Sequence, residues 1–360
     1  MTTATERPVG AEEARFLEIS RKGDSGAFAM LTEQYRRQLH VHCYRMLASY
    51  EDAQDLTQDV FLRAWRSRHT FQGRSSLRTW LYRIATNACL DFLDRRPDRA
   101  PVPASAEGAP PEVGYLQPYP DRLLDEISAD GTDDPGALVV AKETIELAFL
   151  VAVQHLPPRQ RAALILRDVL GWPAKQTAAV LGSSVASANS ALQRARATMR
   201  EKLPDRRLDW RSSPERELTD DERVLVRRYI EAHASGDAHG LAAILSEDLR
   251  FAMPPEPGTW VGRDAIMRDW ISGGFGSESF GVWQCEFIRA NRQPAIVAYL
   301  RRPGDTEFRA FGIDVLTIKD GLVTDIIGFP IEVCRGFQLS PTLPATPPGP
   351  ERRRRANGFR

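Results

Sequence analysis

Hydrophobic and polar positions follow a helical period through the first quarter of the chain. Apolar residues recur at three- and four-residue spacings across residues 11–96, for example at Phe28, Leu31 and Tyr35. This spacing places them on one helix face and predicts nearly continuous amphipathic helix. After a loop that contains Gly and Ser, the last helix of this region is expected over residues 77–96, because the next residue is proline.

A proline-rich stretch separates this region from a second helical one. Residues 97–120 hold seven prolines among 24 residues, mixed with Ala, Ser, Gly and Glu. This composition predicts an extended, mostly unstructured linker, which we place at residues 98–135. Helical periodicity resumes at about Asp134 and continues to Leu203, with one break at residues 156–158.

The pattern changes after residue 218, where two helical segments at about 219–235 and 238–246 precede strand-like runs. The expected strands cover residues 249–253, 281–290, 295–301, 308–319 and 322–330. A Lys-Asp-Gly turn between the last two predicts a hairpin. These features predict a separate α+β domain over 218–338, followed by a disordered basic tail over 339–360 that is rich in proline and arginine.

Composition and charge narrow the class of protein. The 360 residues carry 48 basic and 48 acidic side chains and are 42% apolar, which predicts a globular protein of two or three domains. Apolar runs are too short for a membrane span, and the first residues lack the apolar core of a secretory signal. The four scattered cysteines form no CxxC pair and the six histidines no HExxH pattern. We therefore expect reduced thiols, a cytoplasmic location, no metal and no cofactor.

Charge is distributed unevenly along the chain. Residues 156–211 contain 11 Lys and Arg against 4 Asp and Glu. Within this basic segment, an apolar helical stripe, Gly182 and then Ser183 and Ser184 predict a helix, a turn and a capped second helix. The second helix has small polar residues first and cations one to two turns later, which is the arrangement a major-groove reader needs. An ordinary helical hairpin with a basic, solvated face is the alternative.

A second segment could bind unpaired bases. Residues 80–96 interleave aromatic, amide and arginine side chains on one helix, and the aromatic Phe71 lies in the loop before it. Single strands are held by stacking on aromatic rings, with Arg on the backbone. Here the alternative is that Trp80, Tyr82 and Phe92 belong to the core.

The two segments together, in this order and joined by a linker, resemble the extracytoplasmic-function (ECF) sigma factors of bacterial RNA polymerase. The resemblance is carried by DAQDLTQDVFLRAW, FQGRSSLRTWLYRIATNACLDFLDRR, HLPPRQRAALILRDVLGWPAKQTAAVLG and ANSALQRAR. It covers residues 15–97, as sigma region 2, and 136–205, as sigma region 4. The resemblance implies two all-α domains that bind core RNA polymerase and promoter DNA and carry out no covalent chemistry.

The family's functional positions transfer onto particular residues. On the helix that the family docks on the β′ clamp helices lie Asp55, Gln58, Asp59, Phe61 and Trp65. On the loop and helix that meet the −10 element lie Phe71, Gly73, Arg74, Trp80, Asn87, Asp91, Arg95 and Arg96. On the −35 reader lie Ser187, Asn189, Ser190, Gln193, Arg194 and Arg196. The resemblance further implies a contact of the second domain with the β flap.

The linker departs from the family minimum because it is longer and contains an aromatic insertion. Its candidate contact residues are Tyr115, Pro118, Tyr119 and Asp121. Linkers in this family follow the RNA exit path, so the insertion is expected to form a contact surface; a disordered tether is the alternative.

The C-terminal domain resembles a SnoaL-like (NTF2-like) cone, in which helices precede a curved sheet. The resemblance implies a built-in regulator that contacts the sigma domains, with an unknown small molecule as a further candidate partner. The fold also includes enzymes that use a pocket carboxylate or histidine as a base. Candidates for such a pocket are Asp248, Tyr299, Asp314 and Asp325, although none has an acid–base partner nearby in sequence.

Two other functional readings stay open at this point. A ligand-responsive helix-turn-helix regulator would bind duplex DNA without polymerase, whereas a sigma factor binds promoters tightly only with it. An NTF2-like enzyme with a DNA-binding recruiting module would need an acid–base pair in its pocket. The clamp-like helix disfavours the first reading, and the lack of a recognisable pair disfavours the second.

Overall fold

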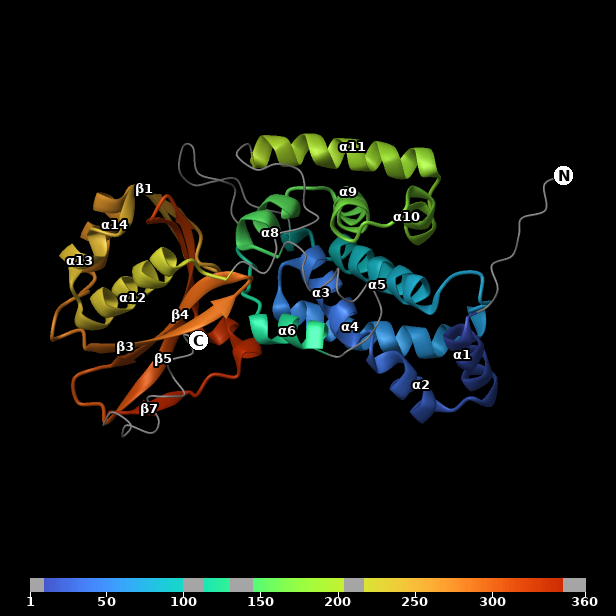
Figure 1. Ribbon diagram of the computed structural model, residues 1–360, viewed down its shortest axis with the longest axis horizontal. Coiled ribbons are helices and arrows are strands. Elements are labelled where there is room, and N and C mark those ends of the chain that lie inside the picture. The colour runs from blue at the N-terminus through green and yellow to red at the C-terminus, as the bar shows by residue number, and fades with distance from the viewer. Residues whose placement is uncertain (1–9, 100–112, 130–144, 204–216, 346–360) are drawn as a thin grey trace. The chain divides into compact units, whose positions relative to one another are not determined.

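The computed structural model describes residues 10–99, 113–129, 145–203 and 217–345, and it divides into two compact units (Figure 1). One unit combines Met1–Ala100 with Leu123–Pro214, and the other combines Pro101–Arg122 with Glu215–Arg360. The described linker residues 113–120 therefore belong to the C-terminal unit, although they lie between two parts of the helical unit in sequence.

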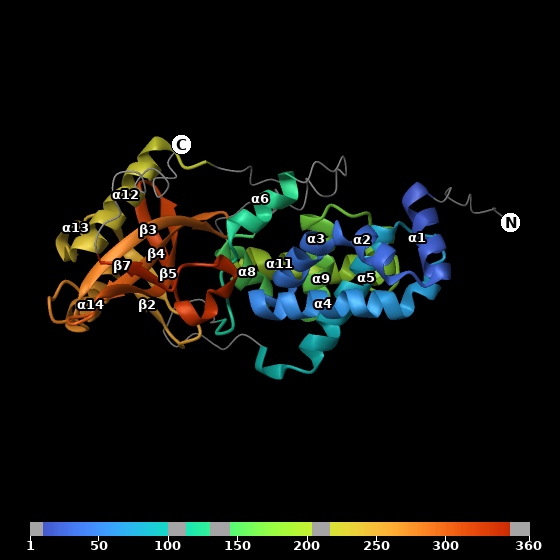
Figure 2. The ribbon, with the colours of Figure 1, turned by 90° about the horizontal axis from the view of Figure 1, so that it is seen from below.

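The first part of the helical unit consists of short helices whose starts are set by polar caps. The elements are α1 (Ala11–Lys22), α2 (Ser25–Glu33), α3 (Arg36–Leu47), α4 (Tyr50–Ser67), η1 (Arg68–Thr70), α5 (Leu77–Asp94) and η2 (Pro97–Arg99). The side chains of Asp24, Ser49 and Ser76 accept hydrogen bonds from the first turns of α2, α4 and α5. In both views α3, α4 and α5 lie side by side (Figure 1, Figure 2). The expected amphipathic helix is confirmed, with breaks at these caps.

The later helical elements contain the expected helix-turn-helix. They are α6 (Asp121–Ala129), α8 (Leu147–Gln154), α9 (Pro158–Leu164), the π-helical turn η3 (Ile165–Val169), α10 (Ala174–Val180) and α11 (Val185–Lys202). Gly182 has a φ of 58°, which a glycine adopts without strain, and the Ser184 side chain caps α11 by accepting from the Ser187 N–H at 3.1 Å. The expected resumption of helix at Asp134 lies outside the described residues.

The C-terminal unit is a mixed sheet with helices. Its helical elements are α12 (Asp220–Ser235), α13 (Ala238–Ala242), α14 (Arg263–Ser272), η4 (Ile331–Val333) and η5 (Arg335–Phe337). Its strands are β1 (Leu245–Ala252), β2 (Thr259–Val261), β3 (Val282–Ala290), β4 (Gln293–Arg301), β5 (Glu307–Lys319), β6 (Leu322–Pro330) and β7 (Thr342–Pro344). The strand order is β2-β1-β6-β5-β4-β3, with β1 parallel to β6 and the other pairs antiparallel.

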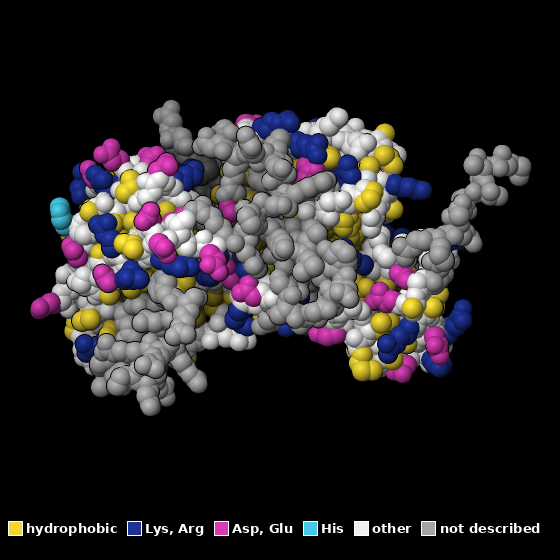
Figure 3. All heavy atoms as spheres, viewed as in Figure 1, with side chains coloured by type: hydrophobic (Ala, Val, Ile, Leu, Met, Phe, Trp, Pro, Cys, Tyr) yellow, Lys and Arg dark blue, Asp and Glu magenta, His cyan; other side chains and the backbone are white. Residues whose placement is uncertain are grey.

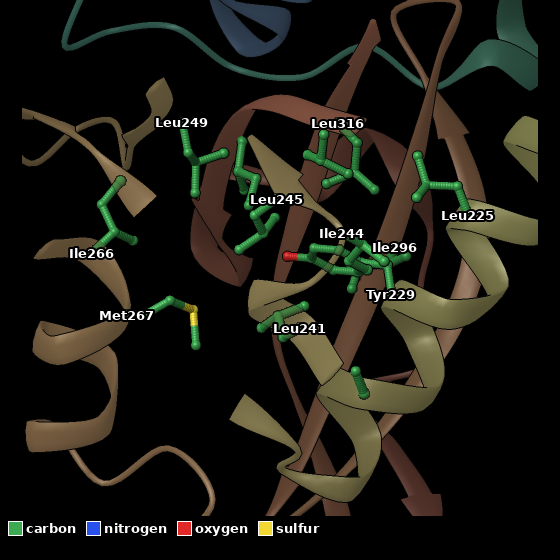
Figure 4. Packing of buried hydrophobic residues seen from close by; sticks show 13 residues of the cluster. Leu225, Tyr229, Leu241, Ile244, Leu245, Leu249, Ile266, Met267, Ile296 and Leu316 are labelled. Atoms are coloured by element: carbon green, nitrogen blue, oxygen red, sulfur yellow. The ribbon is translucent and has the colours of Figure 1, made fainter. Parts of the chain in front are cut away.

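A buried apolar cluster joins the helices of this unit to its sheet (Figure 4). Tyr229 of α12, Leu241 of α13 and Met267 of α14 meet Ile296 of β4 and Leu316 of β5. All five are at most 6% exposed, and each fully buried aliphatic side chain stabilises the fold by about 1.5–3 kcal/mol. The expected α+β domain is therefore confirmed, with a core of its own.

The linker is more ordered than its proline content predicts. Described residues at its C-terminal end form a β-bridge between Pro120 and Ala290 and then the helix α6. The sequence after Asp121 supplies the physical reason, because Leu123, Leu124 and Ile127 recur at helical spacing once the prolines end. The prediction of a mostly unstructured linker is thus wrong for residues 113–129, while residues 100–112 and 130–144 lie outside the description.

Two boundaries in the C-terminal unit also differ from expectation. The second helix ends at Ala242 rather than near residue 246, because Leu245 already pairs with Val323 as the start of β1. The tail contributes β7, which pairs with β5 from Glu307 to Arg309. That part of β5 extends beyond the reach of β6, so its backbone groups are open to another strand. The rest of the expected tail, residues 346–360, is outside the described residues.

Candidate functional site

The expected polymerase-docking residues lie on α4, where they fall into two environments. Asp55 and Gln58 are exposed, whereas Asp59 is half-buried and accepts a hydrogen bond from Arg63 at 2.7 Å. Leu62, four residues after Gln58, is 54% exposed although it is a large apolar side chain. Sequence reasoning missed Leu62, yet its spacing from Gln58 places it on the same helix face.

The two aromatic residues of this set pack within the helical unit. The Arg36 guanidinium lies over the Phe61 ring at 4.8 Å from its centroid. Trp65 contacts Phe28 edge-on, with centroids 5.1 Å apart, while Arg68 lies 4.0 Å over its ring. Both aromatic side chains are partly buried, so their rings fix the position of α4 more than they extend from it.

Two aromatic residues expected at unpaired bases are in the core instead. Phe71 is 4% exposed and Trp80 is 3% exposed, and both contact Phe16 of α1 edge-on. Their own centroids are 5.5 Å apart. This arrangement matches the alternative reading for Trp80, because burying three rings together removes a large apolar area from water. Of the three expected residues in the loop, Phe71 and Gly73 are buried and Arg74 is exposed.

The C-terminal half of α5 offers a polar, exposed face. Asn87 is exposed, and Asp91 is partly exposed and accepts from Arg63 Nη1 at 2.8 Å. Arg95 and Arg96 at the helix end are also exposed. Arg83, one turn before Asn87, shares this face and was missed, although its i, i+4 spacing is visible in the sequence.

Helix α11 exposes most of its expected DNA-reading residues. The exposed members are Ser187, Asn189, Ser190, Gln193 and Arg194. Figure 3 shows basic side chains on the surface over this helix. Arg196 differs, because its Nε and Nη2 donate to the two carboxylate oxygens of Asp168 at 2.7 and 2.6 Å. This bidentate pair raises the pKa of Arg196 and ties α11 to η3.

The linker is held at the tip of the β3–β4 hairpin. Backbone N–H of Tyr119 donates to Asn291 Oδ1 at 2.7 Å, and the N–H of Asn291 returns a hydrogen bond to the Tyr119 carbonyl at 2.9 Å. Asn291 and Arg292 have φ values of 56° and 60°, as a two-residue hairpin turn requires. Tyr119 is 1% exposed, so the linker is docked in the C-terminal unit as a buried segment.

A buried carboxylate reinforces this docking. Asp121 is 3% exposed and accepts from the Arg292 backbone N–H at 2.8 Å and from Arg289 Nε at 3.1 Å. Burial raises the pKa of Asp121, and the two arginines oppose that shift. One residue later, Arg122 donates to the Gly336 carbonyl at 2.7 Å. Three of the four expected linker contact residues (Pro118, Tyr119 and Asp121) are buried, and Tyr115 is partly buried.

The C-terminal unit also contains a cavity of about 760 Å³. Of the four candidate pocket residues, only Asp314 lines it. Asp248 is exposed and bonded to Ser246, and Asp325 accepts from Arg250 Nε at 2.7 Å outside the cavity. Tyr299 is buried in β4 and does not line the cavity, so these three are structural or surface groups.

Among the residues that the structure describes, there is neither a metal-binding cluster nor a membrane-spanning helix. Their His, Cys, Asp and Glu side chains form no group of three that could hold a metal ion. Their helices include none that is both long and apolar enough to cross a membrane.

Comparisons with known proteins fit this geometry. The Sigma-70 region 2 model matches residues 31–97, the Sigma-70 region 4 model residues 146–199, and the SnoaL-like domain model residues 226–326. The chain is 39% identical over 319 residues to the ECF RNA polymerase sigma factor SigG of Mycobacterium tuberculosis, covering 86% of this chain and 82% of that protein. It is 28% identical over 185 residues to the ECF RNA polymerase sigma factor SigW of Bacillus subtilis, covering 51% of this chain and 93% of that protein.

A solved structure has a similar fold. The crystal structure of the Mycobacterium tuberculosis ECF sigma factor SigJ matches with a TM-score of 0.53 and 22% identity. The match covers 85% of this chain and 97% of that one. It therefore includes the two helical regions together with a C-terminal α+β part.

Proposed function

The chain belongs to the ECF RNA polymerase sigma factors, and we propose that its SnoaL-like domain modulates transcription by holding the linker between sigma regions 2 and 4. As a sigma factor, the protein binds core RNA polymerase and directs promoter recognition and transcription initiation. Family membership removes the reading as a polymerase-independent repressor. We assign the SnoaL-like domain a binding role rather than a catalytic one.

Within this function, we assign contacts to the exposed faces. The α4 face with Asp55, Gln58 and Leu62 is proposed to dock on the β′ clamp helices, and sigma region 4 on the β flap. The α5 face with Asn87 is proposed to meet the −10 element. The α11 face with Arg194 is proposed to read the −35 duplex, where side-chain contacts to base edges supply specificity and contacts to phosphate supply affinity.

The observation that carries the regulatory proposal is the docked linker. Reciprocal hydrogen bonds join Tyr119 to Asn291, and Asp121 is buried against Arg289 and Arg292. A linker segment whose contact residues are buried in the SnoaL-like domain is not free to bind polymerase. The docked form is therefore the restrained one, and release of the linker is expected to raise transcription.

This regulation is tested by loosening the hairpin tip without straining it. Asn291→Gly removes the side-chain acceptor for the Tyr119 N–H, and glycine keeps the positive φ of the turn. One lost hydrogen bond of about 0.5–1.5 kcal/mol shifts docking by about 2- to 12-fold. Asp320→Gly is the matched control, because Asp320 has a φ of 50° in the exposed β5–β6 turn.

Two measurements decide the outcome. Hydrogen exchange reports whether linker residues 113–122 are released, and single-round transcription with core polymerase reports activity. We expect Asn291→Gly to raise both exchange and transcript yield, while Asp320→Gly matches wild type in each. Faster exchange with unchanged or lower transcription would contradict a restraining role for the docked linker.

A further inference from the structure

The cavity of the SnoaL-like domain has mainly aromatic walls. Its largest wall residues include Trp260, Trp270, Phe275, Phe280, Trp283 and Phe311. Trp283 stacks near Phe280 with centroids 5.7 Å apart and contacts Phe311 edge-on at 5.1 Å. Phe311 is 45% exposed and Trp260 is 36% exposed, although side chains of this size are usually covered. A volume of about 760 Å³ between such rings suits a flat, largely apolar molecule.

A carboxylate lies among these rings without a charged partner. Asp314 of β5 lines the cavity, and Tyr229 of α12 donates a hydrogen bond to its Oδ2 at 3.2 Å. Across the described part of the chain, no Lys or Arg forms an ion pair with Asp314. Burial raises its pKa to about 6, so ionisation of this carboxyl opposes folding.

Neighbouring groups do not supply the missing positive charge. His233 of α12 also lines the cavity, and its Nδ1 lies 3.3 Å from Cys285 Sγ of β3. Burial lowers the pKa of His233 to about 4, which leaves its imidazole neutral near pH 7. Burial also raises the pKa of Cys285, so its thiol stays protonated. Near pH 7 the charge on these three side chains is therefore the negative charge of Asp314 alone.

The rest of the wall has the same sign. Glu256, Asp269 and Glu332 line the cavity together with Asp314, and its lining contains neither Lys nor Arg. Arg302, outside the lining, lies 5.6 Å from the Phe280 centroid, so one ring of this group already attracts a cation. Aromatic faces combined with unpaired carboxylates favour a positive ligand and repel a negative one.

We propose that this cavity binds a flat, largely apolar cation, such as a polycyclic or aromatic amine, with its positive group facing Asp314 and its rings between the aromatic walls. A neutral molecule of the same shape would leave the Asp314 carboxylate unpaired, and an anion would meet four carboxylates. The site does not depend on the proposed role of the linker, because every residue named for it lies in the SnoaL-like domain.

Three tricyclic probes of similar size test the proposal by calorimetric titration of the full-length protein. At about pH 8, above the pKa of Asp314, proflavine is a cation, acridone is neutral and anthracene carboxylate is an anion. Tryptophan fluorescence gives a second readout, since Trp260, Trp270 and Trp283 line the cavity. We expect proflavine to bind saturably and about tenfold or more tightly than acridone, with the anion weakest.

Variants then locate the charge that selects the probe. Asp314→Asn keeps the shape of the side chain and should weaken proflavine about tenfold while changing acridone less than about twofold. Glu332→Gln, in the wall and exposed, should weaken proflavine only about two- to threefold. Asp248→Asn changes an exposed carboxylate outside the cavity and should match wild type for every probe.

Other results overturn the proposal. Absence of saturable proflavine binding would do so, as would acridone binding at least as tightly as proflavine. If folded Asp314→Asn and Glu332→Gln proteins both keep wild-type affinity for proflavine, the cation does not bind in this cavity. None of these results bears on linker release, which is measured separately by exchange and transcription.

Discussion

The two units of this sigma factor present their recognition groups in opposite ways. In the helical unit, Asp55, Asn87 and Arg194 lie exposed on separate helix faces. In the SnoaL-like unit, Asp121 of the linker is buried against Arg289 and Arg292, and Asp314 lies in a cavity. An exposed group stays hydrated until its partner arrives, whereas an enclosed one loses hydration on folding. Substitutions at the exposed groups of the first unit should therefore change partner binding without changing stability. Substitutions at the enclosed groups of the second unit should change stability as well, to an extent that depends on pH.

The largest expected effect is on the pH dependence of stability and is caused by Asp314. Its pKa in the folded protein is about 6, against an ordinary value of 3.8, so the folded state binds this proton more tightly than the unfolded state does. The contribution of this protonated carboxyl to the free energy of unfolding is complete below about pH 4, and it is lost as the pH rises through about 6. The difference between these two pKa values corresponds to about 3 kcal/mol of stability. The Asp314→Asn protein has no ionisable group at this position, so its stability should not fall in this way as the pH rises.

We therefore expect Asp314→Asn to gain stability relative to wild type as the pH rises from about 4 to 7. Calorimetric melting of both proteins at several pH values checks this expectation. Tyr229, Cys285 and Cys334, which face Asp314, keep their protons throughout this range because burial raises their pKa values. Burial lowers the pKa of His233 to about 4, so His233 adds its own pH dependence, but it does so in both proteins and cancels in their difference. A difference in stability that does not vary with pH would show that the carboxylate is not desolvated.

The next effect concerns Arg194 and Arg196, which are two residues apart on α11 but lie in different environments, one exposed and the other paired with Asp168. Arg194→Ala should weaken binding to a −35 duplex by about 1–3 kcal/mol if the side chain reaches a base, without lowering the melting temperature. Arg196→Ala should instead loosen the pairing of α11 with Asp168 and affect DNA less. Polymerase-dependent promoter binding and thermal melting separate the two.

A larger effect of Arg196→Ala than of Arg194→Ala would contradict these separate roles of the two side chains. If Arg196→Ala weakens promoter binding more than Arg194→Ala without lowering the melting temperature, Arg196 contacts DNA directly and its ion pair with Asp168 opens on binding. A loss that is equal on all sequences, with a salt slope lowered by about one, would identify a phosphate contact instead of a base contact.

The smallest effect is expected on α4. Asp55→Lys should weaken binding of core polymerase about three- to tenfold, because the charge is reversed at an exposed position, and leave melting unchanged. The helix dipole is not a sufficient role for Asp55, since Glu51 and Asp52 already occupy the first turn. Asp59→Lys should in addition lower stability slightly through the lost pair with Arg63. Undiminished polymerase capture by folded Asp55→Lys protein would refute the docking role.

Local signals allowed much of the fold to be predicted. Gly182 and Ser184 define the helix-turn-helix, and the Asp320-Gly321 pair predicts the hairpin, since these two residue types readily adopt the positive φ values that the turn has. Such features depend on a few neighbouring residues, so the amino-acid sequence alone is sufficient to predict them. The same is true of the exposed polar face of α11, which its spacing already indicates.

The features that sequence reasoning missed or could not decide depend on distant partners. Phe71 and Trp80 are buried because Phe16 of another helix completes their cluster. Arg196 is paired because η3 places Asp168 beside it. Asp314 has no acid–base neighbour in sequence, and only the folded sheet encloses it with aromatic rings. No local pattern contains these contacts.

During translation the linker is synthesised well before the β3–β4 turn that binds it. Tyr119 precedes Asn291 by 172 residues, so a ribosome adding about 5–20 residues per second needs roughly 10–30 s to supply the hairpin. Throughout that interval the linker emerges without the residues that hold it. Each newly synthesised chain thus passes through an unrestrained period, and slower translation of the SnoaL-like domain would lengthen it.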